Sequence, residues 1–144
     1  MTAKKGFTYL LIAFVVFVFV QSLFFKFSGS EETTIIFSTI ATWMTTVGLS
    51  FLAPSFESVG GYVIGGIELI ASILLIIPAT RRIGALLGIT ILSGAIFFHL
   101  FTPLGINRVI DAAGNTDGGG LFYMACGVWI SCLLIFILTK KENK

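Results

Sequence analysis

Four long apolar segments alternate with polar stretches along this chain of 144 residues. They cover residues 7–27, 61–78, 83–101 and 121–138. Each approaches the length of about 20 residues with which an α-helix crosses a bilayer. The pattern therefore predicts an all-α integral membrane protein in which four transmembrane helices form a bundle.

A fifth apolar stretch, residues 33–52, differs from the other four because Thr and Ser interrupt it throughout and Trp43 lies near its middle. This composition favours an interfacial or re-entrant helix on the outward side over a fifth span. The acids that follow Ser30 are typical of a helix start. Pro54 is expected to end the segment, and residues 57–60 are expected to form a loop.

Composition agrees with a membrane protein, since 56% of the residues are hydrophobic and only 11% are charged. No basic tract suits nucleic acid. Cys126 and Cys132 do not form a C-x-x-C pair and are interpreted as apolar packing residues. No catalytic residue and no metal site are assigned, and whether the chain is an enzyme is left open.

The basic residues predict the orientation, because Lys and Arg favour the cytoplasmic side of a membrane. With four spans, only Lys26 and Arg108 fall on one side. The opposite side carries Lys4, Lys5, Arg81, Arg82, Lys140, Lys141 and Lys144. We therefore expect both termini in the cytoplasm of a bacterial inner membrane, with residues 28–60 and 102–120 facing outward.

The second and third spans each contain one ionisable residue, Glu68 and His99 respectively. At about 100° per residue, small residues share a face with each of them. These neighbours are Gly61, Gly65 and Ser72 beside Glu68, and Gly84, Gly88 and Ala95 beside His99. Small faces are where membrane helices approach closely, and a charged group facing lipid is costly. Both side chains are therefore predicted to point into the bundle.

Most polar groups of the spans fall in the outward half of the bundle, and they are the candidate ligand-binding residues: Lys26, Glu68, His99, Gln21, Ser72 and Tyr123. Intramembrane ionisable residues often line a binding site. One interpretation is a pocket for a small polar or amphipathic molecule, in which His99 bonds a quinone or carbonyl oxygen. The other is a Lys26–Glu68–His99 network that only locks the helices together. Under either, Glu68 should lie within reach of Lys26 or His99.

At these positions the chain resembles the DoxX-like family of small four-span membrane proteins. The residues that carry the resemblance are Lys26, Gly65, Glu68, Leu74-Leu75, Thr80-Arg81-Arg82, Ala95 and His99. In outline it extends over residues 10–138. The resemblance implies a four-helix bundle and, for some members, an association with oxidoreductase complexes that use quinone or handle sulfur compounds.

The first functional hypothesis is a membrane subunit or anchor of such a complex, with a quinone-like ligand near Glu68 and His99 and a soluble or membrane redox partner. The second is an envelope protein that binds or transports a small molecule without redox chemistry. The third is a membrane assembly factor. Lipid is the expected surrounding in every case, and a homo-oligomer is left open.

Overall fold

The computed structural model describes residues 2–139 and folds them into five α-helices. These are α1 (Ala3–Phe27), α2 (Glu31–Thr46), α3 (Ala53–Ile76), α4 (Arg81–Phe101) and α5 (Gly120–Leu138). All except α2 are long and apolar enough to cross a membrane. The predicted all-α fold with four candidate spans is confirmed, and these helices indicate a multi-pass membrane protein.

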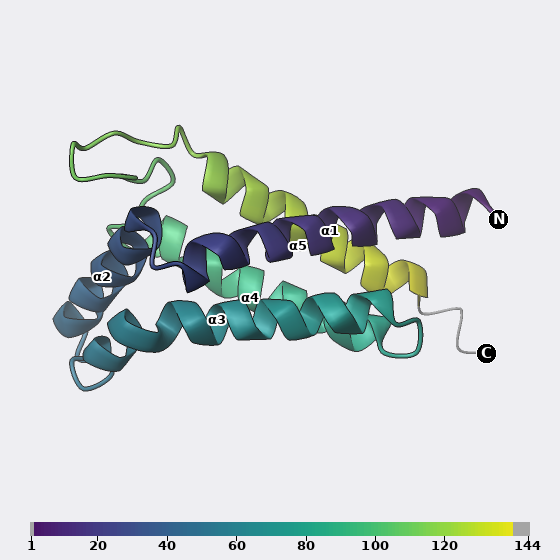
Figure 1. The fold of residues 1–144 in the computed structure, drawn as a ribbon, viewed down its shortest axis with the longest axis horizontal. Helices are drawn as coiled ribbons and strands as arrows, with labels where there is room; N and C mark the ends of the chain where they lie inside the picture. The colour runs from purple at the N-terminus through teal and green to yellow at the C-terminus, as the bar shows by residue number, and fades with distance from the viewer. Residues whose placement is uncertain (1, 140–144) are drawn as a thin grey trace.

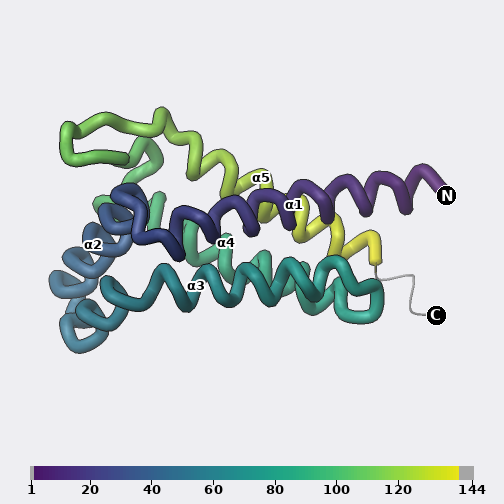
Figure 2. Tube along the Cα trace, viewed as in Figure 1, coloured from purple at the N-terminus to yellow at the C-terminus, as the bar shows by residue number. Residues whose placement is uncertain are grey.

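The four long helices run lengthwise, and α2 lies across the end opposite the two termini (Figure 1). Helix α1 packs against α3 and α5, and α4 packs against the same two helices, so the bundle has the ring order α1–α3–α4–α5. Helix α2 packs mainly on α3. The Cα trace shows the α4–α5 connection extending beyond the bundle at the α2 end (Figure 2).

Two tight turns place α2 at this end of the bundle. Helix α1 stops where Gly29 adopts φ 65°, and the Ser30 N–H returns to the Phe25 carbonyl. Helix α2 stops in the same manner, with Gly48 at φ 85° and the Leu49 N–H on Met44 O. A residue with positive φ and such a returning bond ends a helix by satisfying its last carbonyls. Helix α2 has 16 residues and ends at Thr46, six residues before the end of the predicted segment 33–52.

The start of α3 corrects one prediction. Residues 57–60 are not a loop, because α3 begins at Ala53 and carries Pro54 in its first turn. Proline fits the first turn of a helix well, since its missing N–H would lack an intrahelical partner there. The second candidate span therefore begins about two turns earlier than the predicted 61–78 and ends at Ile76.

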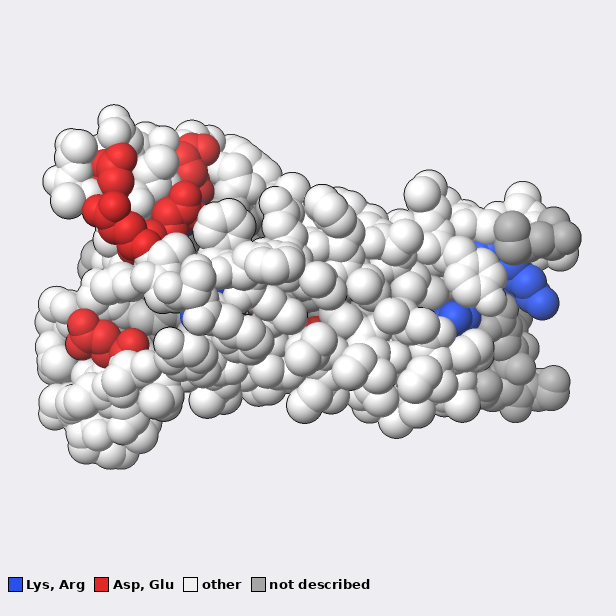
Figure 3. All heavy atoms as spheres, viewed as in Figure 1, with Lys and Arg blue, Asp and Glu red and all other residues white. Residues whose placement is uncertain are grey.

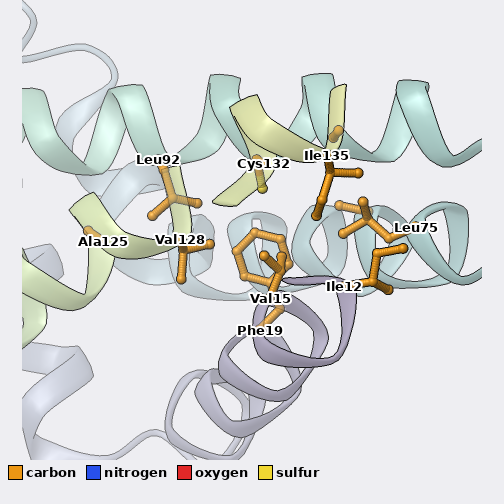
Figure 4. Packing of buried hydrophobic residues seen from close by; sticks show 11 residues of the cluster. Ile12, Val15, Phe19, Leu75, Leu92, Ala125, Val128, Cys132 and Ile135 are labelled. Carbon is orange, nitrogen blue, oxygen red and sulfur yellow. The ribbon is translucent and has the colours of Figure 1, made fainter. Parts of the chain in front are cut away.

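The main core lies where the four long helices meet (Figure 4). Phe19 from α1, Leu75 from α3 and Val128 from α5 are each at most 2% exposed. A second cluster lies under α2 and joins Ile40 and Met44 to Leu104 of the α4–α5 connection. Between membrane helices, lipid removes most of the hydrophobic driving force, so close packing of this kind stabilises the bundle.

Glycines allow α4 to approach its neighbours closely. A Cβ on Gly84 would lie 2.7 Å from Leu75 N and 2.9 Å from Ala71 O, which are backbone atoms of α3. A Cβ on Gly88 would lie 2.5 Å from Cys132 Sγ of α5. Backbone atoms cannot rotate away as a side chain can, so the α3–α4 contact requires glycine at position 84.

We therefore expect Gly84→Ala to lower the free energy of unfolding by about 1–3 kcal/mol, the usual cost of overpacking. The control is Gly94→Ala on the same helix, where an added Cβ has no atom within 4 Å. This control should be neutral or stabilising by up to about 1 kcal/mol, because Ala favours helix over Gly. Thermal unfolding in detergent measures both, and equal melting temperatures for the two variants would contradict the close approach.

Candidate functional site

A buried ion pair joins α1 to α3. Lys26 Nζ lies 2.8 Å from Glu68 Oε2, and the side chains of these residues are 18% and 8% exposed. Ser22, one turn before Lys26, donates its hydroxyl to the same carboxylate oxygen at 2.7 Å and accepts from Lys26 Nζ at 3.0 Å. Glu68 thus points into the bundle, as predicted, and of its two predicted partners, Lys26 and His99, it pairs with Lys26. A carboxylate with a cation and a hydroxyl donor can remain charged in an apolar surrounding.

The face that carries Glu68 explains how the pair forms. Gly65 precedes Glu68 by one turn, and a Cβ there would lie 2.8 Å from the Phe27 ring and 3.2 Å from Leu23. The missing side chain lets the end of α1 lie against α3, which brings Lys26 within reach of the carboxylate. The packing role predicted for the small residues near Glu68 is therefore observed at Gly65.

A small cleft opens beside Lys26, between the end of α1, the start of α2 and the first turns of α3. Its volume is about 130 Å³, and it is lined by Lys26, Gly29, Thr33, Thr34, Phe37, Glu57, Ser58, Gly61 and Tyr62. Pockets that enclose a whole drug-sized ligand have volumes of about 300–1,000 Å³. This cleft is therefore large enough for the polar end of a molecule and too small for all of one.

Lys26 connects the cleft to the buried ion pair. An ammonium group has three N–H donors. Two of the Lys26 donors bond Glu68 and Ser22. Its third N–H has no partner among the described residues, and Lys26 also lines the cleft. Glu57 adds a carboxylate to the same lining. Because Glu68 already balances the charge of Lys26, an anion would meet Glu57 with no further cation beside it, so the site suits a neutral acceptor such as a carbonyl oxygen.

Glu57 and Ser58 of this cleft were not among the sequence candidates. They were assigned to a loop, whereas they belong to the first turns of α3. The spacing of these residues places Glu57 on the same helical face as Gly61, Gly65 and Glu68. The helix-compatible position of Pro54 was the signal that could have identified them.

The other sequence candidates lie elsewhere. His99 is 4% exposed, and its Nδ1 lies 2.7 Å from Gly105 O. Because a carbonyl oxygen only accepts, Nδ1 carries the proton and donates. Among residues 2–139, no hydrogen bond joins His99 to Glu68 or Lys26. The expected three-residue network is thus reduced to the Lys26–Glu68 pair with Ser22, and His99 anchors the α4–α5 connection.

Ser72 is buried on the Glu68 face, but its hydroxyl donates to the backbone carbonyl of Glu68 and not to the carboxylate. Gln21 and Tyr123 are exposed on the outer surface of α1 and α5. Gln21 lies roughly 140° around α1 from Lys26, as a separation of five residues requires. The structure therefore brings together Lys26 and Glu68 and leaves Gln21 and Tyr123 outside the site.

A second charged group at the same end joins the α4–α5 connection to α2. Arg108 is 4% exposed, and its Nη2 lies 2.8 Å from Glu32 Oε2. Its Nε lies 3.1 Å from Asp117 Oδ2 without hydrogen-bond alignment, so this contact is an ion pair only. Glu31 adds a bond from the Ala112 N–H at 2.7 Å. Nothing near Arg108 in the sequence indicates this pairing, because Glu32 is 76 residues away.

Within that connection, Asp111 holds a turn. The Asn115 side chain donates to it at 2.7 Å, and the Asn115 backbone N–H donates at 3.1 Å. These bonds favour the ionised carboxylate and lower the pKa of Asp111 below its ordinary value. The α4–α5 connection thus has hydrogen-bonded turns and a charged contact with α2.

Acidic and basic side chains separate along the molecule (Figure 3). Apart from Glu68, every acid in residues 2–139 belongs to α2, the start of α3 or the α4–α5 connection. Lys4, Lys5, Arg81 and Arg82 lie at the opposite end. Arg81 also caps α3 there, since its Nε donates to Leu75 O at 3.0 Å and its guanidinium lies 5.1 Å from the Tyr9 ring centre.

Within residues 2–139, no group of three His, Cys, Asp or Glu side chains could hold a metal ion. Cys126 and Cys132 are free thiols. Comparison with known proteins found no matching family model, no matching curated protein and no matching solved structure.

The charged contact at Arg108 predicts a measurable effect. Arg108→Ala removes a hydrogen bond between charged groups and leaves Glu32 and Asp117 without their cation. We expect the free energy of unfolding to fall by about 1.5–3 kcal/mol. Residues 106–118 should also become more sensitive to protease. The control Thr116→Ala removes an exposed side chain of the same connection and should change neither measurement; equal sensitivity of the two variants would contradict the role of Arg108.

Proposed function

We propose that the protein binds the polar end of a small amphipathic molecule at the outward end of its bundle. The observation that carries this proposal is the position of Lys26, which is paired with buried Glu68 and also lines the cleft. An ion pair with only a structural role needs no adjoining polar cleft. A bound molecule with a carbonyl or hydroxyl oxygen would accept the third N–H of Lys26, and Thr33, Thr34 and Ser58 add hydroxyl groups around it.

The apolar part of such a molecule would lie outside the cleft. An apolar groove of about 420 Å³ follows the adjoining surface of α1 and is lined by Val20, Leu23, Phe24, Phe27 and Ser28. Phe27 of this groove stacks on Tyr62 of the cleft with ring centres 6.0 Å apart. A carbonyl-bearing ring with an apolar tail, as in a quinone, combines the acceptor that Lys26 needs with a chain that suits the groove.

The proposed setting is a bacterial inner membrane with both termini in the cytoplasm. The separation of charges supports this orientation, since basic residues favour the cytoplasmic side. Helix α2 would then lie at the outer interface of the bilayer, with the Trp43 ring among Phe97 and Phe98 of α4. Aromatic side chains are frequent at that depth. In this arrangement the cleft opens outward.

We further propose that the protein serves as the membrane subunit of an oxidoreductase complex. Two points support it: the resemblance to DoxX-like chains and the fit of a quinone-like carbonyl to Lys26. Envelope binding or transport without redox chemistry would use the same cleft. Mass spectrometry of the molecules that accompany the purified protein distinguishes the ligands, and purification from a membrane extract under mild detergent tests for a redox partner.

Paired substitutions test the ligand site. Lys26→Met alone leaves the Glu68 carboxylate buried without its cation, which should lower stability by about 3–5 kcal/mol. Lys26→Met combined with Glu68→Gln removes both charges, and the amide introduced at position 68 retains a partner in Ser22. This double variant should fold with nearly wild-type stability and bind a short-chain quinone roughly 10- to 150-fold more weakly, the loss expected for a charged donor. Titration calorimetry in detergent measures the affinity.

Lys5→Met serves as the control, because Lys5 is exposed at the opposite end of α1. It should leave both stability and quinone affinity unchanged. A double variant that folds and keeps the wild-type affinity would show that Lys26 does not contact the ligand. A wild-type protein that binds no quinone and carries no amphipathic molecule through purification would overturn the proposed function.

The orientation has its own test. A single cysteine at Asn115, in the α4–α5 connection, should react with a membrane-impermeant maleimide added to intact spheroplasts. A single cysteine at Lys5 should react only after the membrane is permeabilised. Both variants need Cys126→Ala, because that thiol is partly exposed. The reverse labelling pattern would invert the proposed topology.

A further inference from the structure

Helix α1 carries a regular stripe of exposed residues on its outer surface. The α1 stripe consists of Phe7, Leu10, Phe14, Phe17, Gln21 and Phe24. All six are exposed, from 37% at Phe14 to 73% at Phe24 among the apolar members. Their spacing alternates between three and four residues without a break, which is the a/d pattern of a helix seam.

The fold within one chain leaves this stripe uncovered. The buried residues of α1 are Thr8, Ile12, Val15 and Phe19, and they lie on the opposite side of the helix. Tyr9, Val20, Phe25 and Phe27 are exposed as well, so the stripe is part of a wider apolar face of α1. A register that averages 3.5 residues per turn is the one that keeps two helices in contact over their length.

Gln21 is the one polar residue of the stripe, and its amide group is unfavourable in contact with lipid. Its amide has no hydrogen-bond partner among the described residues. It lies six residues before the end of α1, or about 9 Å along the axis. The exposed hydroxyls of Thr90 and Ser93 on α4 bond carbonyls of their own helix, at Leu86 and Ile89. A glutamine amide in hydrocarbon needs a partner from outside the chain.

We propose that the α1 stripe is the contact between two copies of this chain, with the two Gln21 amides hydrogen-bonded to each other. A glutamine amide contains both donors and acceptors, so it complements its own copy across a two-fold axis. Copies inserted in one orientation place Gln21 at the same depth, and the stripe then meets itself residue by residue. A different partner protein would need a matching polar group at that depth.

This dimer leaves the Lys26 cleft free, although Phe24 of the stripe also lines the apolar groove proposed for the tail of the ligand. Lys26 lies roughly 140° around α1 from Gln21 by helical geometry, and it faces α3. The core residues of α1 also keep their intrachain partners, because none of them belongs to the stripe. Substitutions at Gln21 therefore test dimerisation without changing Lys26 or Glu68, so the two proposals can fail separately.

The test measures dimer formation by energy transfer between labelled copies in phosphatidylcholine vesicles at varied protein-to-lipid ratios. Gln21→Leu should weaken association roughly 3- to 30-fold, as expected for the loss of one interhelical polar contact. Gln21→Asn keeps an amide and should retain most of the affinity. Thr90→Leu, an exposed polar residue on α4, should have no effect. Helicity and melting temperature of the monomer should be unchanged in all three.

Disulfide cross-linking tests the face directly, in a background with Cys126→Ala. Cysteines introduced at Phe14 and Phe17 should cross-link two copies on mild oxidation. A cysteine at Val20, which lies roughly 90° around α1 from the centre of the stripe, should not. A wild-type chain that stays monomeric at all ratios would overturn the proposal. So would an unchanged affinity of Gln21→Leu, or cross-linking at Val20 as efficient as at Phe17.

Discussion

Lys26, near the end of α1, and Glu68, in the second half of α3, form an ion pair between the two helices. In an apolar surrounding each charge requires the other, because an unpaired buried charge is strongly unfavourable. The pair therefore determines where the end of α1 lies. That position in turn places the α1–α2 turn and the cleft that Lys26 lines, so the arrangement at the α2 end of the molecule depends on one 2.8 Å contact.

In the rest of the bundle, the arrangement depends on how closely neighbouring helices approach one another. Gly65 admits Phe27 of α1 to the surface of α3, and Gly84 brings α4 against the α3 backbone. Where helices end, polar side chains satisfy the last carbonyl groups, as Arg81 does for Leu75. Backbone groups near the edge of a bilayer have few alternatives, so these contacts explain why the polar residues of so apolar a chain cluster at helix ends and junctions.

The two ends of the molecule use charge differently. Near the termini, Arg81 and Arg82 lie over aromatic rings, and Arg81 also bonds backbone carbonyls, which makes that end compact and basic. At the other end, Arg108 binds Glu32 and Asp117 and fastens the α4–α5 connection over α2. Helix α2 is thus held from both sides, by tight turns and by an ion pair. The cleft beside Lys26 has walls with a defined position as a result.

The sequence by itself determined the number and approximate bounds of the four candidate spans. A helix that crosses a bilayer must be long and apolar, and such a stretch can be recognised from its own residues alone. The sequence also determined that Glu68 faces inward and needs Lys26 or His99 as a partner, since small residues mark a packing face and a buried carboxylate needs a cation; the structure decided for Lys26. Only the tertiary structure decided that His99 bonds Gly105, that Gln21 and Tyr123 face outward, and that α3 begins at Ala53. The tertiary structure alone also decided the pairing of Arg108 with Glu32, since these residues are 76 positions apart in the chain. Periodicity tells which residues share a face, whereas the partner of a face depends on how helices distant in sequence pack together.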